Sequence, residues 1–395
     1  MTTAPTAPPT SDALLPVYRR MPLEISAGSG VRLFDNDGRS YLDFTSGIAV
    51  NALGYGDPGF VNALRAASET GLVHVSNLYS TAPARQLAES LVAKSFASSV
   101  FFCNSGAEAN EGAFKFARRW ARTTRGDAAT DIIAVRGSFH GRLFGTLAAT
   151  DRPAYRAPFR PLAPGISIVE RDLAAIEGAL AGGTVAAVIA EPVQGEGGVR
   201  VLSTHFLRAL RDLTRAHGVA LIFDEVQCGL GRTGRLFAYE HSGVEPDIMT
   251  LAKPLAGGLP MGAVLLASHI AATIKPGDHA TTFGGGPFVA SVASYVLERL
   301  SDEELLASVR DNGAWLGDQL ASLSLRLPTV RAVRGVGYIW GIDVTAPAGT
   351  VVGKALEAGL LVVTAGDHTI RLLPPLVATR DELGEGLATL EEVLA

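Results

Sequence analysis

The sequence has few cysteines, little charge and no long apolar run. Cys103 and Cys228 are its only cysteines, and their separation argues against a zinc site and predicts reduced thiols in the cytoplasm. Apolar runs such as Val185–Ala190 fall far short of the ~18 residues that a membrane-spanning helix needs. Charged residues make up 18% and the net charge is −5, without a basic stripe. We therefore expect neither a membrane nor a nucleic acid as a partner, and no metal.

The composition is that of a folded protein with more than one domain. Hydrophobic residues make up 47% of the 395 residues, which is enough for a sizeable core. Residues 1–10 are rich in proline and threonine and predict a disordered leader without a secretory signal. Residues 11–50 are expected to pack with a small domain. Residues 51–289 are predicted to form the large domain and 290–395 the small α+β domain.

Short, nearly all-apolar runs dominate the middle of the chain. Helical stretches such as Glu108–Trp120 and His205–His217 separate several of them. Apolar strands that alternate with helices are typical of an α/β fold with a mostly parallel sheet covered on both faces. The runs are Val100–Cys103, Ile132–Val135, Val185–Ala190, Ala220–Phe223, Ile248–Leu251 and Ala263–Ala267.

The two ends of the chain have different patterns. Val31–Asp35 and Tyr41–Phe44 flank the Asp-Gly turn at Gly38 and predict a hairpin. Beyond residue 290 we expect a mixture of helices and strands. The helices are Ala290–Leu300, Asp302–Leu320 and Asp381–Leu394, and the strands are Gly335–Val344, Leu361–Thr364 and Thr369–Leu372.

In an open α/β sheet, ligands bind beyond the carboxyl ends of the strands, and two runs end in residues that suit a phosphorylated ring. Ser105-Gly106-Ala107 begins a helix, whose free N–H groups favour a phosphate, with Ser105 as a further donor. By itself this pattern also fits an ordinary capped helix. Phe139 can stack on a planar group and Arg142 can bind a carboxylate, although a core Phe and a surface Arg are commoner.

Two further runs end in ionisable residues. Asp224 follows a buried strand, so its carboxylate needs a partner, either a protonated ring nitrogen or a metal. Glu191 is a similar second acid, or a member of a structural salt bridge. Lys253 follows Ile248–Leu251, where desolvation favours the neutral, nucleophilic amine, although a single lysine is more often a surface residue. Together the four patterns supply a phosphate site, a stacking partner, an acid and a lysine, which is what pyridoxal phosphate (PLP) requires.

Six segments resemble the class III PLP-dependent aminotransferases, from about Leu15 to the C-terminus. This resemblance implies the fold type I architecture, with a mostly parallel seven-stranded sheet, a smaller α+β domain and a homodimer with sites at the subunit interface. The joint occurrence of six motifs is far more specific than one glycine pattern. The segments read NSGAEANEGAFKFAR, SFHGR, AEPVQGEGGV, FDEVQCGLGRTG, LAKPLAGGLPMGA and TTFGGGP.

The resemblance also assigns the cofactor contacts. It implies that Lys253 carries PLP as a Schiff base and later moves a proton, while Asp224 pairs with the ring nitrogen. Gln227 would reach the ring hydroxyl, and Phe139 would stack on the ring. Four more residues would hold the phosphate, the last of them from the neighbouring subunit: Ser105, Gly106, Ala107 and Thr282.

The substrate contacts implied by the resemblance are three. Arg371 would clamp the α-carboxylate of glutamate or 2-oxoglutarate, and Glu196 would pair with Arg371 when the other substrate is bound, since a buried unpaired arginine is costly. Arg142 would grip the far carboxylate of N-acetylornithine. Within the family the chain most resembles members that transfer the terminal amine of N-acetylornithine to 2-oxoglutarate in arginine biosynthesis.

Some positions depart from the family pattern. Tyr55 follows Gly54 where the family has histidine, and Gly286 stands in place of an asparagine. Ornithine enzymes tend to carry a tyrosine near Gly47-Ile48, and its absence here favours an N-acylated donor.

Several alternatives stay open. The amino donor can instead be ornithine, succinylornithine, 4-aminobutyrate or a carrier-linked lysine precursor, because one pocket side chain can shift specificity. An aminomutase is disfavoured by Arg371, since it needs no external 2-oxoglutarate. A nucleotide-binding module on a similar fold is disfavoured by Lys253, Asp224 and Gln227, none of which it would need.

Overall fold

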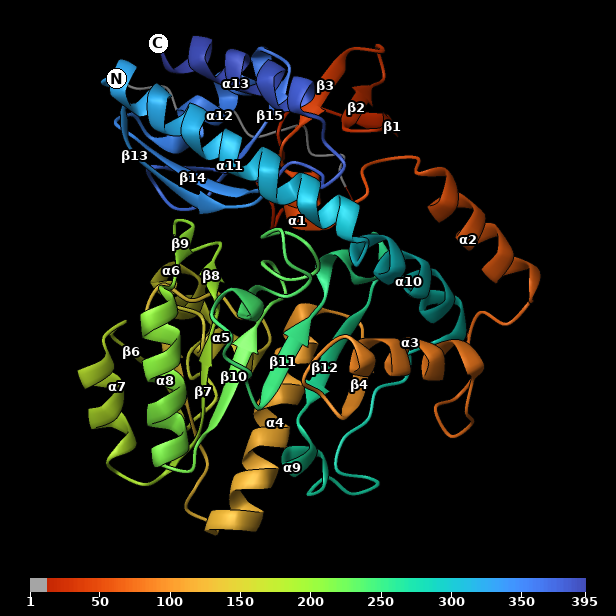
Figure 1. The fold of residues 1–395 in the computed structure, drawn as a ribbon, viewed down its shortest axis with the longest axis vertical. Coiled ribbons are helices and arrows are strands. Elements are labelled where there is room, and N and C mark those ends of the chain that lie inside the picture. The colour runs from red at the N-terminus through yellow and green to blue at the C-terminus, as the bar shows by residue number, and fades with distance from the viewer. Residues whose placement is uncertain (1–12) are drawn as a thin grey trace.

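The computed structural model describes residues 13–395, so the predicted leader lies outside the described residues. Figure 1 shows a large α/β body and a smaller body, and the smaller one contains both the first strands and the last helices of the chain. Among residues 13–395, no helix has the length and the apolar composition needed to cross a bilayer.

A seven-stranded sheet forms the centre of the large body. Its strand order is β4-β12-β11-β10-β7-β5-β6, and β12 alone runs antiparallel to its neighbours. The predicted mostly parallel seven-stranded sheet is therefore confirmed. All six apolar runs are strands in it, and the seventh is the half-exposed edge strand β6. The strands are β4 (Ser99–Cys103), β5 (Asp131–Val135), β6 (Ile166–Val169), β7 (Val185–Ala190), β10 (Ala220–Asp224), β11 (Ile248–Leu251) and β12 (Gly262–Leu266).

The helix α4 (Gly106–Arg125) packs across the middle of this sheet. It begins where the Ser105 side chain accepts a hydrogen bond from the Glu108 N–H, and it ends at Gly126. Small residues such as Ala113 and Ala117 are fully buried on its inner face and let it lie close to the strands. On the other side of the sheet, α8 (Thr204–Ala216) packs against β10 and against α7 (Leu173–Leu180).

The small body holds two four-stranded sheets, of order β1-β2-β3-β15 and β13-β14-β17-β16. The predicted N-terminal hairpin is present as β2 and β3, and β3 pairs in parallel with β15 near the other end of the chain. The elements are β1 (Ile25–Ser29), β2 (Arg32–Asp35), β3 (Ser40–Asp43), β13 (Val330–Val336), β14 (Ile339–Val344), β15 (Leu360–Leu361), β16 (Val363–Thr364), β17 (Thr369–Leu372), α11 (Glu303–Arg326), α12 (Ala348–Glu357) and α13 (Arg380–Leu394).

Two strand predictions in this region are wrong. Gly335–Val344 is not one strand, because the chain reverses at Gly337, whose φ of 55° suits a turn, and β13 and β14 pair on either side of it. Leu361–Thr364 is divided between two strands in different sheets, β15 and β16. Neither the turn at Gly337 nor the break between β15 and β16 is visible in the sequence, because both segments stay mostly apolar throughout.

A long helix connects the large body to the small one. α10 (Pro287–Leu300) packs against α2 (Pro58–Glu69) and α3 (Ala82–Ala93) before the chain enters α11. Within the small body, the Leu373 N–H donates to Phe44 O and so joins the residue after β17 to the residue after β3. We keep the division at residues 50 and 290 as a proposal, with α10 as the connection.

Candidate active site

A pocket of about 410 Å³ lies at the carboxyl edge of the large sheet. Its walls come from the segments that follow β4, β5, β7, β10 and β11, as expected for an open α/β sheet. The structure thereby brings together residues that lie up to about 150 positions apart in the sequence. The predicted site residues that line it are Ser105, Gly106, Ala107, Phe139, Arg142, Asp224, Gln227 and Lys253.

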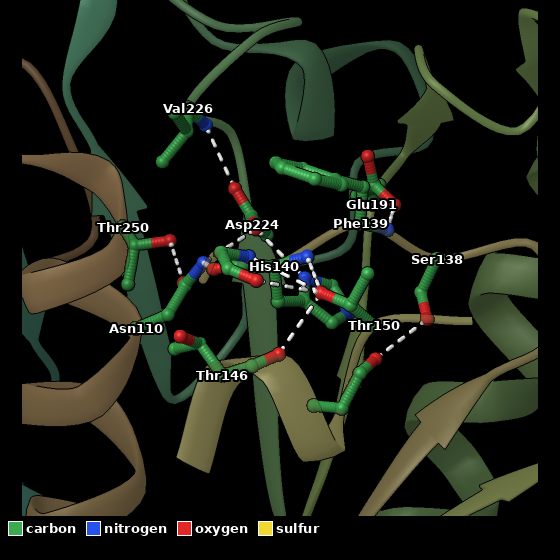
Figure 2. A network of polar contacts seen from close by, with 12 residues as sticks. Asn110, Ser138, Phe139, His140, Thr146, Thr150, Glu191, Asp224, Val226 and Thr250 are labelled. Atoms are coloured by element: carbon green, nitrogen blue, oxygen red, sulfur yellow. Dashed lines mark hydrogen bonds and ion pairs between the residues drawn. The ribbon is translucent and has the colours of Figure 1, made fainter. Parts of the chain in front are cut away.

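Asp224 is held from three sides at the end of β10 (Figure 2). Its Oδ2 accepts a hydrogen bond from Asn110 Nδ2 at 2.7 Å and lies 2.8 Å from His140 Nδ1. Its Oδ1 accepts from the Val226 N–H at 3.0 Å. Thr250 Oγ1 donates to Asn110 Oδ1, which fixes the orientation of the amide. These donors offset the cost of burying the carboxylate and leave it one orientation.

Asn110 and His140 were not predicted as site residues. The sequence gives a weak signal for each, since Asn110 is a polar residue one turn into an otherwise apolar helix face and His140 follows Phe139. Both are buried. Among the described residues His140 Nε2 has no hydrogen-bond partner, so this ring makes its one contact toward Asp224.

We expect Asn110→Ala to lower kcat about 10-fold, because a hydrogen bond to a charged group contributes ~1.5–3 kcal/mol. Asp224 would keep its contacts with His140 and with the Val226 N–H but lose the third donor that fixes its orientation. Steady-state kinetics at saturating substrate measure the effect, with Asn62→Ala, an exposed residue of α2, as the control. A kcat equal to that of the control would show that Asn110 plays no part in holding Asp224.

Glu191 anchors the segment that carries Phe139. Its Oε2 accepts the Phe139 N–H at 3.0 Å, a hydrogen bond drawn in Figure 2. Burial, followed by repulsion from the Asp224 charge, raises the pKa of Glu191 well above its usual range. The interpretation of Glu191 as a second acid near Asp224 therefore fits the geometry better than a structural salt bridge.

Lys253 lies directly after β11 with an unusual backbone. Its φ is 39°, a left-handed value that is strained for a residue with a side chain. Burial, and after it the positive charge of Arg371, lower the pKa of Lys253 to about 8. Within residues 13–395 no hydrogen bond or ion pair engages its amine. The pocket thus contains an amine that is neutral in substantial proportion near physiological pH.

This pKa predicts how the cofactor-free protein takes up an aldehyde cofactor. A protonated amine cannot attack, so the rate should rise about tenfold per pH unit below pH 8 and level off above it. An ordinary lysine of pKa ~10.4 would give a rate that is still rising at pH 10. Stopped-flow absorbance between pH 6 and 10 measures the profile. A continued rise above pH 9 would contradict a depressed pKa.

The N-terminus of α4 forms the opposite wall. The N–H groups of its first turn have no partners inside the helix and point along the positive end of its dipole, which suits a phosphate. Ser105 Oγ accepts from the Glu108 N–H at 3.2 Å, so Ser105 caps the helix as the sequence also allowed. Gly106 and Ala107 line the pocket at this helix start.

Arg142 lies at the mouth of the pocket. Its guanidinium carbon lies 3.6 Å from the centre of the Tyr155 ring and 5.8 Å from that of Phe139. The side chain is exposed. Stacking on Tyr155 orients a planar cation toward a substrate that enters the pocket.

Arg371 and Glu196 form an ion pair behind the pocket. Arg371 belongs to β17 and is 1% exposed, and its Nη1 lies 2.6 Å from Glu196 Oε1. The same Nη1 donates to Gln227 Oε1 at 2.9 Å, a contact that was not predicted. Burial raises the pKa of Glu196, but attraction by Arg371 and Lys253 outweighs it and holds this pKa below its usual value.

Thr282 does not reach this pocket in its own chain. It lines a separate cavity of about 780 Å³ together with His74 and Asn77. Its predicted contact was with the phosphate of a neighbouring subunit, and this contact stays a prediction.

The residues present fit a planar phosphorylated aldehyde. Among the described residues no hydrogen bond or ion pair engages the Lys253 amine, and the same cavity is lined by the fixed carboxylate of Asp224, the Phe139 ring and the N-terminus of α4. The cavity volume lies within the ~300–1,000 Å³ of small-molecule sites. The lysine, the carboxylate, the aromatic ring and the helix N-terminus come from separate segments around this cavity. PLP needs one such group each for its aldehyde, its ring nitrogen, its ring face and its phosphate.

Comparison of the whole sequence with known protein families agrees with the fold and the pocket. Residues 15–394 match the family model for class-III aminotransferases. The chain therefore belongs to the class III aminotransferases, which are PLP-dependent enzymes. The predicted family and cofactor are confirmed.

Individual relatives are similar over nearly the full length. The mitochondrial acetylornithine aminotransferase of Alnus glutinosa is 47% identical over 386 residues, covering 96% of this chain and 85% of that protein. The crystal structure of N-acetylornithine aminotransferase from Stenotrophomonas maltophilia is 38% identical, with a TM-score of 0.84 over 95% of this chain and 96% of that one. Ornithine aminotransferase from Toxoplasma gondii has a TM-score of 0.93 at 32% identity, over 97% and 92%.

Proposed function

We propose that this enzyme transfers the terminal amino group of N-acetylornithine to 2-oxoglutarate, as a step of arginine biosynthesis. The observation that carries the proposal is the ion pair of buried Arg371 with half-buried Glu196 beside Lys253, because it is a carboxylate clamp that can be neutralised. The sequence relatives named as acetylornithine aminotransferases support the choice of donor.

The pocket residues have distinct tasks in such a reaction. When bound, PLP supplies an aldehyde that accepts the amino group and a ring that withdraws electrons. Lys253 would hold the cofactor through its amine and, once displaced by substrate, would carry a proton at Nζ. Asp224, whose orientation its three donors fix, would keep a proton on the ring nitrogen. Phe139 would stack on the ring and exclude water from it.

The two substrates differ in what they present to Arg371. Glutamate and 2-oxoglutarate present a carboxylate, whereas N-acetylornithine presents uncharged methylene groups beside its terminal amine. Glu196 neutralises Arg371 in the second case and gives way in the first, because a buried arginine without a counterion is costly. Arg142, at the mouth, would bind the distant carboxylate of N-acetylornithine.

Glu196→Gln should shift the balance between the two half-reactions. The amide cannot neutralise Arg371, so the half-reaction with N-acetylornithine should weaken about 10-fold relative to that with glutamate. Stopped-flow measurement of both half-reactions gives the ratio, with Glu170→Gln as a control at an exposed surface pair. An unchanged ratio would refute the switch.

The donor is tested by a panel assay with 2-oxoglutarate as acceptor. Glutamate formation is followed with N-acetylornithine, ornithine, succinylornithine, 4-aminobutyrate and lysine. The proposal expects the highest kcat/KM for N-acetylornithine. A higher value for any other donor would keep the aminotransferase mechanism and overturn the proposed pathway.

We also propose a homodimer. Exposed apolar side chains gather beside the cavity that holds Thr282: Leu78 is 89% exposed, Tyr79 69% and Phe283 65%. An exposed group of this kind is typical of a protein interface. Light scattering of the purified protein tests the dimer. The predicted cytoplasmic location stays a prediction.

A further inference from the structure

A second arginine, Arg152, lies beside Glu196 and has no acidic partner among the described residues. Arg152 is partly buried, and its guanidinium donates to two backbone oxygens, Asp151 O at 3.0 Å and Glu196 O. In the part of the chain that the structure describes, no carboxylate lies within ion-pair distance of it. Burial raises the pKa of Glu196, whereas Arg371, Lys253 and Arg152 lower it. Arg152 is thus within electrostatic reach of the Glu196 carboxylate.

The backbone around Glu196 is packed against neighbouring segments on two sides. Glu196 lies in the loop between the short strands β8 (Val193–Gln194) and β9 (Arg200–Val201). A Cβ atom on Gly197 would lie 2.3 Å from Gly137 O, so this loop is pressed against the neighbouring backbone. On the other side, Arg334 Nε donates to Gly198 O at 2.6 Å.

A fixed backbone limits what happens when a substrate carboxylate reaches Arg371. Two carboxylates at one buried guanidinium repel each other, so the Glu196 carboxylate has to leave. Because the loop is packed on both sides, rotation about the side-chain bonds of Glu196 is the smallest movement that takes the carboxylate away. Once it has moved away from Arg371, the Glu196 carboxylate needs another cation, because an unpaired carboxylate in a partly buried place is costly.

We propose that Arg152 receives the Glu196 carboxylate when glutamate or 2-oxoglutarate occupies Arg371. Arg152 is then a positioning residue that determines how easily the acceptor enters, and it leaves the donor half-reaction unaffected. This inference rests on the proposed exchange of Glu196 for a substrate carboxylate. It does not depend on which terminal amine is the donor.

The test compares variants of Arg152 in the PLP-loaded enzyme. Arg152→Gln keeps a polar side chain that can donate hydrogen bonds but has no charge, and Arg152→Lys keeps the charge. In single-turnover kinetics, Arg152→Gln should weaken the apparent affinity for glutamate and 2-oxoglutarate about 10-fold, as expected for a lost charge-assisted hydrogen bond. The half-reaction with the best amino donor should change less than about twofold, and lysine should restore most of the affinity. Arg136→Gln, which removes an exposed arginine, is the control.

A double-mutant cycle separates this role from a merely structural one. If Arg152 acts through the Glu196 charge, Arg152→Gln should have no further effect on the ratio of half-reactions in the Glu196→Gln enzyme. An equal loss in both half-reactions, an unchanged affinity for glutamate, or an undiminished effect in the Glu196→Gln background would overturn the proposal. Failure of the proposed function looks different, because the unmodified enzyme would then either prefer another amino donor in the panel assay or not react with glutamate at all.

Discussion

Lys253→Ala should abolish transamination. The variant loses both the covalent attachment of the cofactor and the group that moves the proton, and proton transfer alone contributes about 10²–10⁴ in rate. We therefore expect kcat to fall by at least about four orders of magnitude. The absorbance of bound cofactor at the edge of the visible range should also be lost, since no other amine in the pocket replaces Lys253.

The matched control is Lys94→Ala, which removes an exposed lysine. It should retain the activity and the spectrum of the unmodified enzyme. Circular dichroism shows whether both variants are folded. Turnover by folded Lys253→Ala within about 100-fold of the control would contradict the role of Lys253, because general acid–base catalysis alone is worth that much.

Asp224→Asn should have the second largest effect. The amide is almost the same size, but it carries no charge to keep a proton on the ring nitrogen. The hydrogen bond from Asn110 at 2.7 Å would also face an amide that can turn its own NH₂ group toward that donor. Removal of one preorganised electrostatic group costs about 10²–10³ in kcat, and we expect a loss of this size.

Asp224→Glu separates charge from position. It restores the charge but displaces it, so its activity should lie between those of the unmodified enzyme and Asp224→Asn. Asp212→Asn, at an exposed position of α8, is the control for a lost charge. Equal kcat values for Asp224→Asn and this control would mean that the carboxylate does not act on the cofactor.

The sequence allows the main parts of the fold and pocket to be predicted because they depend on local pattern. Fully buried strands such as β7 and β10 are continuous apolar runs, and the residues that follow them necessarily meet at one edge of the sheet. For this reason the sequence alone predicts that Asp224 and Lys253 lie at the same edge of the sheet. The edge strand β6 was missed because it is short and half-exposed, and contains a serine.

Contacts between distant segments could not be predicted in the same way. Asn110 is an ordinary polar residue on a helix until α4 is placed over β10, where its amide meets Asp224. The Arg371–Glu196 pair joins two bodies of the molecule, and only the family resemblance suggested it. Arg152 has no motif at all, and its position beside Glu196 appears only in the fold.

The central claim is that Lys253 is the residue that binds the cofactor, and peptide mapping tests it most directly. The PLP-loaded enzyme is reduced with borohydride, digested and examined by mass spectrometry. The chain has five lysines, Lys94, Lys115, Lys253, Lys275 and Lys354, so the other four serve as internal controls. We expect the pyridoxyl label on the peptide that contains Lys253 and on no other. A label on a different lysine, or none at all, would contradict the assignment of this pocket as the active site.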